Sequence, residues 1–193
     1  MCGRYFLEDN ILDELEEKGY KISDQVKDIS LKTIYPSQIG LYITGSSYKK
    51  EVKAARWGFP MKDSSKLIIN ARSETVTEKR MFQKSFEENR ILIIMSSFFE
   101  WNRLKEKYTV KRKDNDIIYT GGLLRNFNGV DTYTMLTTLS NSSMKKIHHR
   151  MPLILEEDMI EDWLFDKEKA KKLLEKNPTE VKYTTAYQQL TLL

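Results

Sequence analysis

The residue types at the start of the chain suit covalent chemistry on a carbonyl group. The sequence begins Met1-Cys2-Gly3-Arg4-Tyr5, and Cys2 is the only cysteine among 193 residues. Removal of Met1 would make Cys2 a 1,2-aminothiol, in which an α-amine with a pKa of about 7.7–8.0 stands beside a thiol near 8.5. The amine can add to an aldehyde as a Schiff base that the thiol closes to a thiazolidine, or the thiol can attack an acyl group with the amine as its base. A chance cysteine near a poorly ordered terminus is the structural alternative.

A second polar cluster, Asn70-Ala71-Arg72-Ser73-Glu74, follows the apolar segment Leu67–Ile69. In an extended segment, Asn70 and Arg72 are two residues apart and therefore share one face. An amide and a guanidinium on one face can hold a sugar or carbonyl oxygen beside a phosphate. A strand-to-helix turn with ordinary solvent-facing polar residues is the alternative.

Two further clusters supply groups for proton transfer. In Ser97-Phe98-Phe99-Glu100-Trp101 a carboxyl group lies between large aromatic side chains, an environment that raises a carboxyl pKa by desolvation and favours a general acid. The alternative is a Glu100 that points to solvent. His148-His149-Arg150-Met151-Pro152 contains both histidines, and imidazole has an ordinary pKa near neutrality. A surface His-His pair before a strand is the alternative for that cluster.

A fifth motif, Arg56-Trp57-Gly58-Phe59-Pro60, joins an arginine to two aromatic residues. Aromatic rings beside cations serve base stacking on single strands, although Trp57 and Phe59 also suit a hydrophobic core. The net charge of +4 is only mildly basic. Arginines recur beside the other motifs, however, and gathering them would create a local basic site that the net charge understates. These arginines are Arg4, Arg72 and Arg150.

The elements that must position these groups are short strands and a few helices. Apolar and β-branched runs predict strands at Ile39–Thr44, Val52–Arg56, Leu67–Ile69, Arg90–Met95, Tyr108–Arg112, Ile117–Thr120 and Tyr133–Thr138. Helical spacing predicts helices at Asn10–Leu15 with a stop at Gly19, Thr75–Glu88, Ser142–Ile147, Glu157–Phe165 and Lys167–Lys176. For the second of these, Thr75-Val76-Thr77-Glu78 reads as a capping box, with Met81, Phe82 and Phe86 as the inner face. We therefore expect an α+β fold with a mainly antiparallel, barrel-like curved β core flanked by several helices.

Composition limits the class of protein. A length of 193 residues with 40% hydrophobic content fits one domain with a sizeable core, and no repeat or linker divides it. One cysteine excludes an intrachain disulfide, and with two adjacent histidines it makes a poor zinc set. The longest apolar run, Ile91–Met95, is far too short for a membrane span, and acidic residues interrupt any signal peptide. We expect a cytoplasmic monomer without a cofactor or a structural metal.

Five motifs together resemble one family. Met-Cys-Gly-Arg-Tyr, Arg-Trp-Gly-Phe-Pro, Asn-Ala-Arg-Ser-Glu-Thr, Phe-Phe-Glu-Trp and Ile-His-His-Arg-Met-Pro occur between Met1 and Leu155 in the order of the SOS response-associated peptidase (SRAP) family, the abasic-site DNA–protein crosslinking proteins. The resemblance implies a single α+β domain over residues 1–193 and a positively charged groove for single-stranded DNA. It also implies nucleoid association when the protein is bound to DNA.

The resemblance further implies that the protein captures the ring-opened deoxyribose of an abasic site as a thiazolidine on Cys2, after self-directed removal of Met1. The residues that match catalytic positions are Cys2, Asn70, Glu100 and His148, and those that match DNA contacts are Arg4, Trp57, Phe59, Arg72 and Arg150. One departure precedes the glutamate. The family usually has Pro-Ala-x-Gly-Phe-Tyr-Glu-Trp, whereas Ile94–Trp101 here lacks the proline and the glycine, which can change the loop before Glu100.

Two other function classes remain open from the residues. An N-terminal-nucleophile hydrolase such as a glutamine amidotransferase also begins Met-Cys-Gly and would use Cys2 on an amide, although Asn70, Glu100 and His148 do not fit it well. Glutaminase activity without DNA dependence would favour that class. A noncatalytic single-strand-binding module would retain intact and abasic strands equally and give no covalent product.

Overall fold

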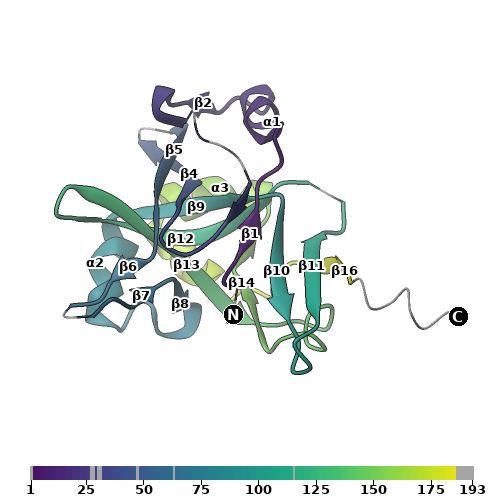
Figure 1. Ribbon diagram of the computed structural model, residues 1–193. Coiled ribbons are helices and arrows are strands. Elements are labelled where there is room, and N and C mark those ends of the chain that lie inside the picture. Colours follow the sequence, from purple (N-terminus) through teal and green to yellow (C-terminus); the bar gives the residue numbers. More distant parts are fainter. Residues whose placement is uncertain are drawn as a thin grey trace, which may run out of the picture.

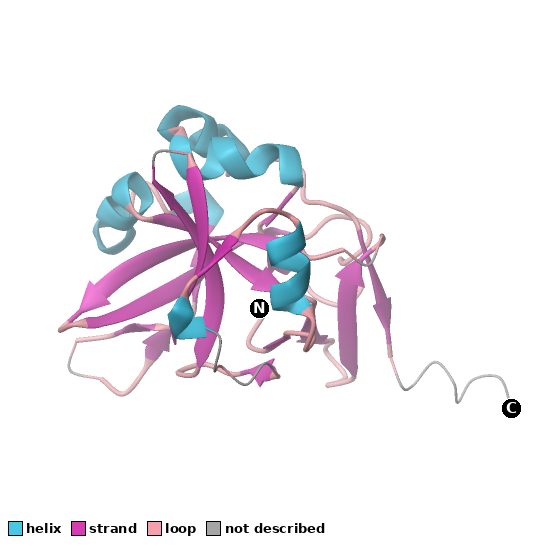
Figure 2. Cartoon of the chain, turned by 90° about the horizontal axis from the view of Figure 1, so that it is seen from above, coloured by secondary structure: helices cyan, strands magenta, loops and turns pink. Residues whose placement is uncertain are grey.

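The computed structural model describes residues 2–26, 29, 32–46, 48–62, 64–114 and 116–185. Strands form the centre and the helices lie at their periphery (Figures 1 and 2). The strands are β1 (Tyr5–Phe6), β2 (Lys21–Ile22), β3 (Thr33–Ile34), β4 (Ile39–Ser46), β5 (Lys49–Trp57), β6 (Phe59–Pro60), β7 (Leu67–Ile68), β8 (Asn70–Arg72), β9 (Arg90–Met95), β10 (Ser97–Trp101), β11 (Lys107–Arg112), β12 (Ile118–Phe127), β13 (Val130–Leu139), β14 (Arg150–Pro152), β15 (Ile154–Leu155) and β16 (Val181–Thr184). The helices are α1 (Ile11–Glu17), α2 (Arg80–Glu88), α3 (Ile160–Phe165) and α4 (Lys167–Leu173), with short 3-10 helices η1 (Asp24–Val26), η2 (Ser73–Thr75) and η3 (Glu157–Met159).

Five strands of the larger sheet close into a barrel. β13, β12, β9, β4 and β5 are antiparallel neighbours in that order, and β5 then pairs with β13 in parallel through Tyr133 opposite Trp57. Closure of this kind removes exposed edges. The arrangement confirms the expected α+β class with a mainly antiparallel, barrel-like core.

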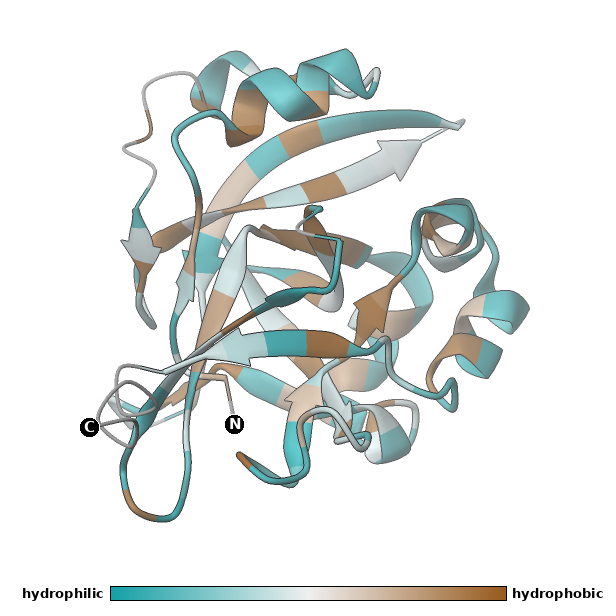
Figure 3. Ribbon diagram, turned by 90° about the vertical axis from the view of Figure 1, so that its right-hand side faces the viewer, coloured by the Kyte–Doolittle hydropathy of each residue, from teal (hydrophilic) through white to brown (hydrophobic). Residues whose placement is uncertain are grey.

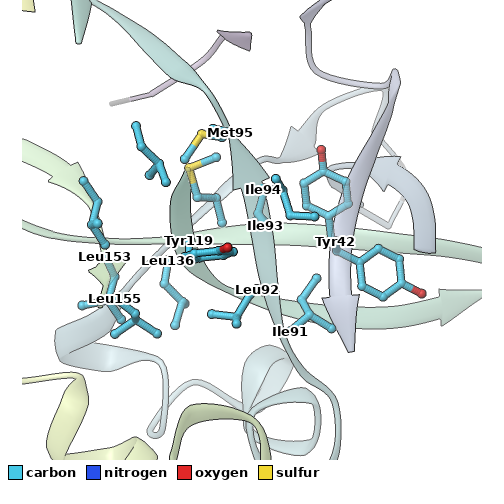
Figure 4. Close-up of a cluster of buried hydrophobic side chains, with 14 of the residues drawn as sticks. Tyr42, Ile91, Leu92, Ile93, Ile94, Met95, Tyr119, Leu136, Leu153 and Leu155 are labelled. Atoms are coloured by element: carbon cyan, nitrogen blue, oxygen red, sulfur yellow. The ribbon is translucent and has the colours of Figure 1, made fainter. Parts of the chain in front are cut away.

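The barrel forms around continuous apolar strands. Every residue of β9 is buried, as its unbroken apolar run predicts, and Figure 4 shows its side chains packed with Tyr42, Tyr119 and Leu136 from neighbouring strands. The strand predicted at Ile117–Thr120 proves much longer, because β12 continues through Gly121 and Gly122. Glycines are poor strand formers, but a Cβ on Gly122 would lie 2.8 Å from Ile93, so the packing requires them here.

The helices cover the barrel with their apolar sides. In Figure 3 the helix at the top of the view has its hydrophobic residues toward the strands and its hydrophilic residues outward. α3 is anchored through Trp163, which is fully buried and whose indole N–H donates to the carbonyl of Ile91 (2.8 Å). Among the described residues, no helix is long and apolar enough to cross a membrane.

A second sheet carries the N-terminus. Its strand order is β16-β11-β10-β1-β3, and it stands beside the barrel (Figure 1). β1 pairs with β10 through Tyr5 opposite Phe98, and β10 pairs with β11 through Glu100 opposite Tyr108. The sheet therefore brings the start of the chain next to the strand that contains Glu100.

Two predictions about helices are wrong. The segment at Thr75 is not a capping box: η2 ends there, α2 begins only at Arg80, and its N-cap receives no side-chain bond. Phe82 and Phe86 are buried as expected, but Met81 is 37% exposed. Residues 142–147 form turns instead of a helix, because the segment is held by Asn141, whose side-chain amide donates to the carbonyls of Pro178 and Thr179.

Candidate active site

β1 places Cys2 inside the protein. Beyond the β1–β10 pairing, the backbone N–H of Phe99 donates to the carbonyl of Arg4 (3.0 Å), which extends the ladder toward the N-terminus. The Cys2 side chain is fully buried, and its thiol donates to the same Arg4 carbonyl (3.5 Å). Cys2 is therefore an ordered residue and not a chance cysteine on a loose terminus. Met1, whose removal the sequence predicts, lies outside the described residues.

Asn70 reaches Cys2 from the barrel side. β8 adds to β13 in parallel, with Asn70 opposite Met135, and the Asn70 side-chain N–H donates to the Cys2 carbonyl (2.8 Å). The other side-chain atom of Asn70, Oδ1, is buried and accepts no hydrogen bond within the described part of the chain. An acceptor of this kind is costly to bury and marks a place for a donor.

Glu100 lies on β10 and is only 4% exposed, so the solvent-facing alternative is wrong. Its Oε1 accepts from the backbone N–H of Trp101 (3.4 Å). Burial, and secondarily the negative charge of Glu100, raises the pKa of the Cys2 thiol to about 12. The thiol is thus protonated at neutral pH, and the group beside it that can take a proton is a carboxylate.

Two arginines lie at the site with different surroundings. The guanidinium of Arg4 is stacked 4.5 Å from the centre of the Tyr35 ring and 5.0 Å from that of Trp101. Arg72 is exposed on β8, two residues from Asn70, on the same face of the strand as predicted. Neither arginine forms an ion pair within the described residues, so both can meet an external anion.

His148 stands between the buried core and an open cleft. Its Nδ1 is 3.0 Å from the backbone nitrogen of Arg150 and 3.1 Å from the Arg150 carbonyl oxygen, which fixes the ring. It shares a cleft with Trp101, the residue after Glu100, and its ring stacks 4.4 Å from that of His149. The charge of His148 lowers the pKa of His149.

Three predicted DNA contacts belong to the protein interior instead. Trp57 is fully buried between Tyr5 and Tyr133 at the seam where the barrel closes, and its indole N–H donates to the Ile69 carbonyl (3.0 Å). Phe59 is fully buried against Phe82 and Phe127. Neither ring has a free face for a base, so the sequence-based assignment is wrong for both.

Arg150 is the third predicted DNA contact that lies in the protein interior. It is buried, and its guanidinium makes a two-pronged ion pair with Glu74 at 2.6 and 2.9 Å and also donates to the carbonyl of Thr137. A buried guanidinium paired with a carboxylate in this way does not face a phosphate. Its role here is to join β14 to η2, beside His148.

Sequence reasoning missed a pair of tyrosines behind Cys2. The hydroxyls of Tyr5 and Tyr133 are 2.6 Å apart, and both side chains are fully buried. Burial raises the pKa of both phenols. Tyr5 follows Arg4 in the first motif, but the position of Tyr133 in a strand gives no sign of this contact, because 128 residues separate the two.

The sequence is similar to a known protein family and to named members of other organisms. A family model described as "SOS response associated peptidase (SRAP)" matches residues 1–190. The chain is 32% identical over 181 residues to abasic site processing protein YoaM of Bacillus subtilis, covering 85% of this chain and 79% of that protein. It is 22% identical to abasic site processing protein YedK of Escherichia coli, covering 85% and 79%.

Solved structures agree on the fold. A protein from Bacteroides thetaiotaomicron superposes with a TM-score of 0.82 at 23% identity, covering 95% of this chain and 91% of that one. A protein from Bordetella bronchiseptica gives 0.80 at 19% identity, covering 96% and 99%. With the family model matched over nearly the whole length, the chain belongs to the SOS response associated peptidase (SRAP) family.

Proposed function

We propose that this protein processes abasic sites by binding single-stranded DNA and joining Cys2 covalently to the ring-opened deoxyribose. The observation that carries the proposal is the contact of Asn70 with the Cys2 backbone next to a buried Glu100. This arrangement supplies a nucleophile, an orienting amide and a proton acceptor in one place. Relatives named as abasic site processing proteins, at about a third identity, support the same substrate.

The chemistry begins at the nitrogen of Cys2. After Met1 is removed, the free amine attacks the C1′ aldehyde carbon and forms a carbinolamine, which loses water to give an imine. The Cys2 sulfur then attacks the imine carbon, its proton passes to the nitrogen side by way of a base, and a thiazolidine ring closes. One molecule of water leaves in all, and no oxidant or reductant is needed.

The neighbouring groups have separate tasks in this sequence. Because the thiol pKa is about 12, sulfur attack requires a base, and Glu100 is the buried carboxylate whose charge acts on the thiol. Protonated Glu100 first assists departure of water from the carbinolamine, and the carboxylate left by that step then accepts the thiol proton as the ring closes. The free Oδ1 of Asn70 accepts a hydrogen bond from the liberated amine and aims its lone pair. His148, fixed through Nδ1, donates to the sugar oxygen as the ring opens.

DNA binding rests on the two arginines that face outward. Arg72 and Arg4 neutralise phosphates beside the lesion, which makes binding sensitive to salt. Trp101, stacked on Arg4, is the aromatic surface at the site that can meet an unstacked base. The same Cys2 and Glu100 pair is also positioned for the removal of Met1, which we infer to be self-directed.

The test is an adduct assay with a single-stranded oligonucleotide that carries one abasic site, run against the intact strand. The protein should give a product that resists SDS without any reductant, and only with the abasic strand. Cys2→Ala, freed of Met1 by an added methionine aminopeptidase, has an N-terminal amine at position 2 but no sulfur, so it should give a product only when borohydride traps the imine. An unreduced SDS-resistant product from Cys2→Ala would exclude the thiazolidine.

A further inference from the structure

A basic cleft opens beside the candidate active site. It lies between the turn that joins β10 to β11 and the turns at residues 142–147, and its volume is about 740 Å³. His148 and Trp101 form the wall that the cleft shares with the site. The lining residues are Trp101, Asn102, Arg103, Leu104, Lys145, Lys146, Ile147, His148 and His149, and no carboxylate is among them.

The lysines and the arginine of this cleft form no ion pair with any residue that the structure describes. Arg103, Lys145 and Lys146 are exposed and form no ion pair within the described part of the chain. By contrast, Lys111 of the neighbouring strand β11 pairs with Glu8 (2.8 Å), and Lys113, just after that strand, pairs with Glu180. Three unpaired cations around a cleft without carboxylates favour an anionic ligand.

The β10–β11 turn holds an apolar side chain at the mouth of the cleft. The Asn102 side-chain oxygen accepts from the backbone N–H groups of Leu104 (2.9 Å) and Glu106 (3.0 Å), and Lys105 has a positive φ of 62°. The turn is thus built by its own asparagine and presents Leu104, which is 78% exposed. An exposed leucine held in this way suits contact with an unstacked base.

We infer that this cleft binds the nucleotides that flank the lesion on one side, with phosphates at Arg103, Lys145 and Lys146 and a base against Trp101 and Leu104. The inference rests on the proposed function, since it extends the strand from the same site. A cleft with cations at its rim and two apolar side chains at its edge matches a nucleotide strand, whereas inorganic phosphate alone would leave Trp101 and Leu104 unused. The occupant of the cleft is therefore a strand and not a free anion.

The experiment uses three abasic single strands, with the lesion in the middle, at the 5′ end or at the 3′ end. Lys145→Gln/Lys146→Gln removes two cations from the cleft, and Lys49→Gln/Lys172→Gln is the matched control, because these two lysines are also exposed and form no ion pair within the described residues. Loss of two phosphate contacts should slow adduct formation roughly tenfold and reduce the salt slope by about 1.4. We expect this loss with the central lesion and with one of the two terminal lesions, but not with the other. Leu104→Ala should slow the same two substrates without lowering the melting temperature.

Equal rates for the cleft variant and the wild type on all three strands would overturn the inference, as would an equal loss on both terminal lesions. The second result would show a general charge effect. Neither result resembles failure of the proposed function, in which the wild-type protein itself would give no adduct with any of the strands.

Discussion

Cys2 combines a nucleophile with surroundings that hold its proton in place. The thiol is fully buried, donates to the Arg4 carbonyl and feels the charge of Glu100, so its pKa rises to about 12. A buried neutral thiol does not react with passing electrophiles. In the proposed order of events this is useful, because the amine must capture the aldehyde before the sulfur closes the ring.

The first prediction concerns the reactivity of this thiol. Since Cys2 is the only cysteine, alkylation by iodoacetamide followed by mass measurement reports on it alone. Because the thiol pKa is about 12 in the folded protein and near 9.0 in the unfolded chain, the folded protein should react about 1000-fold more slowly than the denatured chain near pH 8. The rate should climb with pH toward 12. Folded and denatured protein reacting alike near pH 8 would show that the thiol is not protected.

The raised pKa of the Cys2 thiol also predicts how the stability of the protein depends on pH. The unfolded chain loses the Cys2 proton near pH 9.0, while the folded chain holds it until about 12, so the unfolded state binds fewer protons between these values. The contribution of Cys2 is therefore fully present below pH 9.0 and is lost as pH rises toward 12. Urea titrations of Cys2→Ala should show a shallower fall in the free energy of unfolding over this range, by up to about 1 kcal/mol per pH unit. Parallel curves of the free energy of unfolding against pH for the wild type and for Cys2→Ala would contradict this contribution of Cys2.

Arg72 and Arg150 are predicted to behave oppositely when mutated. Arg72 is exposed on β8, so Arg72→Ala should leave the free energy of unfolding within about 0.5 kcal/mol and reduce the salt slope of DNA binding by about 0.7. Arg150 is buried against Glu74, and Arg150→Gln should cost about 1–3 kcal/mol of stability by removing the buried ion pair. It should not change the salt slope. Fluorescence anisotropy at several salt concentrations and urea titrations measure the two quantities, and a reduced slope in Arg150→Gln would place Arg150 at the DNA after all.

At the scale of elements, the site depends on how β1, β8 and β13 meet. Cys2 lies three residues before β1, which is tied to β13 through the Tyr5 and Tyr133 hydroxyls. β8 carries Asn70 and is paired along β13. Trp57, at the barrel seam, donates to the carbonyl just before Asn70. The distance between Asn70 and Cys2 is thus set by contacts to one shared strand.

Gly40 on β4 tests this arrangement. A Cβ there would overlap the hydroxyl oxygens of Tyr5 and Tyr133, so Gly40→Ala should destabilise the protein by about 1–3 kcal/mol and slow adduct formation. Tyr5 offers the nearest atom, and Gly40→Ala/Tyr5→Phe should recover part of the loss because the phenol oxygen is gone. The melting temperatures of the four proteins in this cycle give the coupling. Strictly additive effects would mean that the alanine does not meet the tyrosine pair.

Elements with a strong local signal could be predicted from the sequence. Arg90–Met95 was expected from its apolar run and matches β9 at both ends. The expected helix at Ser142–Ile147 failed for a reason outside the segment, because Asn141 bonds to Pro178 and Thr179, nearly forty residues away. Thr75 has a capping residue's chemistry, but its hydroxyl is buried in a turn before the helix starts.

The residues of the candidate site also differ in how far the sequence could predict them. Asn70 and Glu100 could be named from motif and position, since each lies on a strand with a defined face. The burial of these side chains could not be predicted from the sequence. Trp57 and Arg150 resemble nucleic-acid contacts until their partners Ile69 and Glu74 are known. Trp57 is buried by the closure of the barrel against Tyr133, and Arg150 pairs with a residue 76 positions away, and no local pattern encodes either contact.

At the scale of the whole molecule, the barrel and the second sheet have separate roles. Asn70 and Arg72 lie on β8, which pairs with barrel strand β13, Glu100 lies on the second sheet, and Cys2 just before that sheet's β1 accepts a hydrogen bond from Asn70. The second sheet stands beside the barrel (Figure 1). The net charge of +4 is small, yet Arg72, Arg103, Lys145 and Lys146 are exposed and form no ion pair among the residues that the structure describes. Attraction for a polyanion is therefore local, and its direction is set by the fold.

The most direct measurement of the central claim is the intact mass of the product formed with an abasic single strand. The proposed chemistry predicts one species whose mass equals the protein without Met1 plus the oligonucleotide, less one molecule of water, with the modification located on Cys2 by peptide fragmentation. A product that retains Met1, or a crosslink at any residue other than Cys2, would contradict the account.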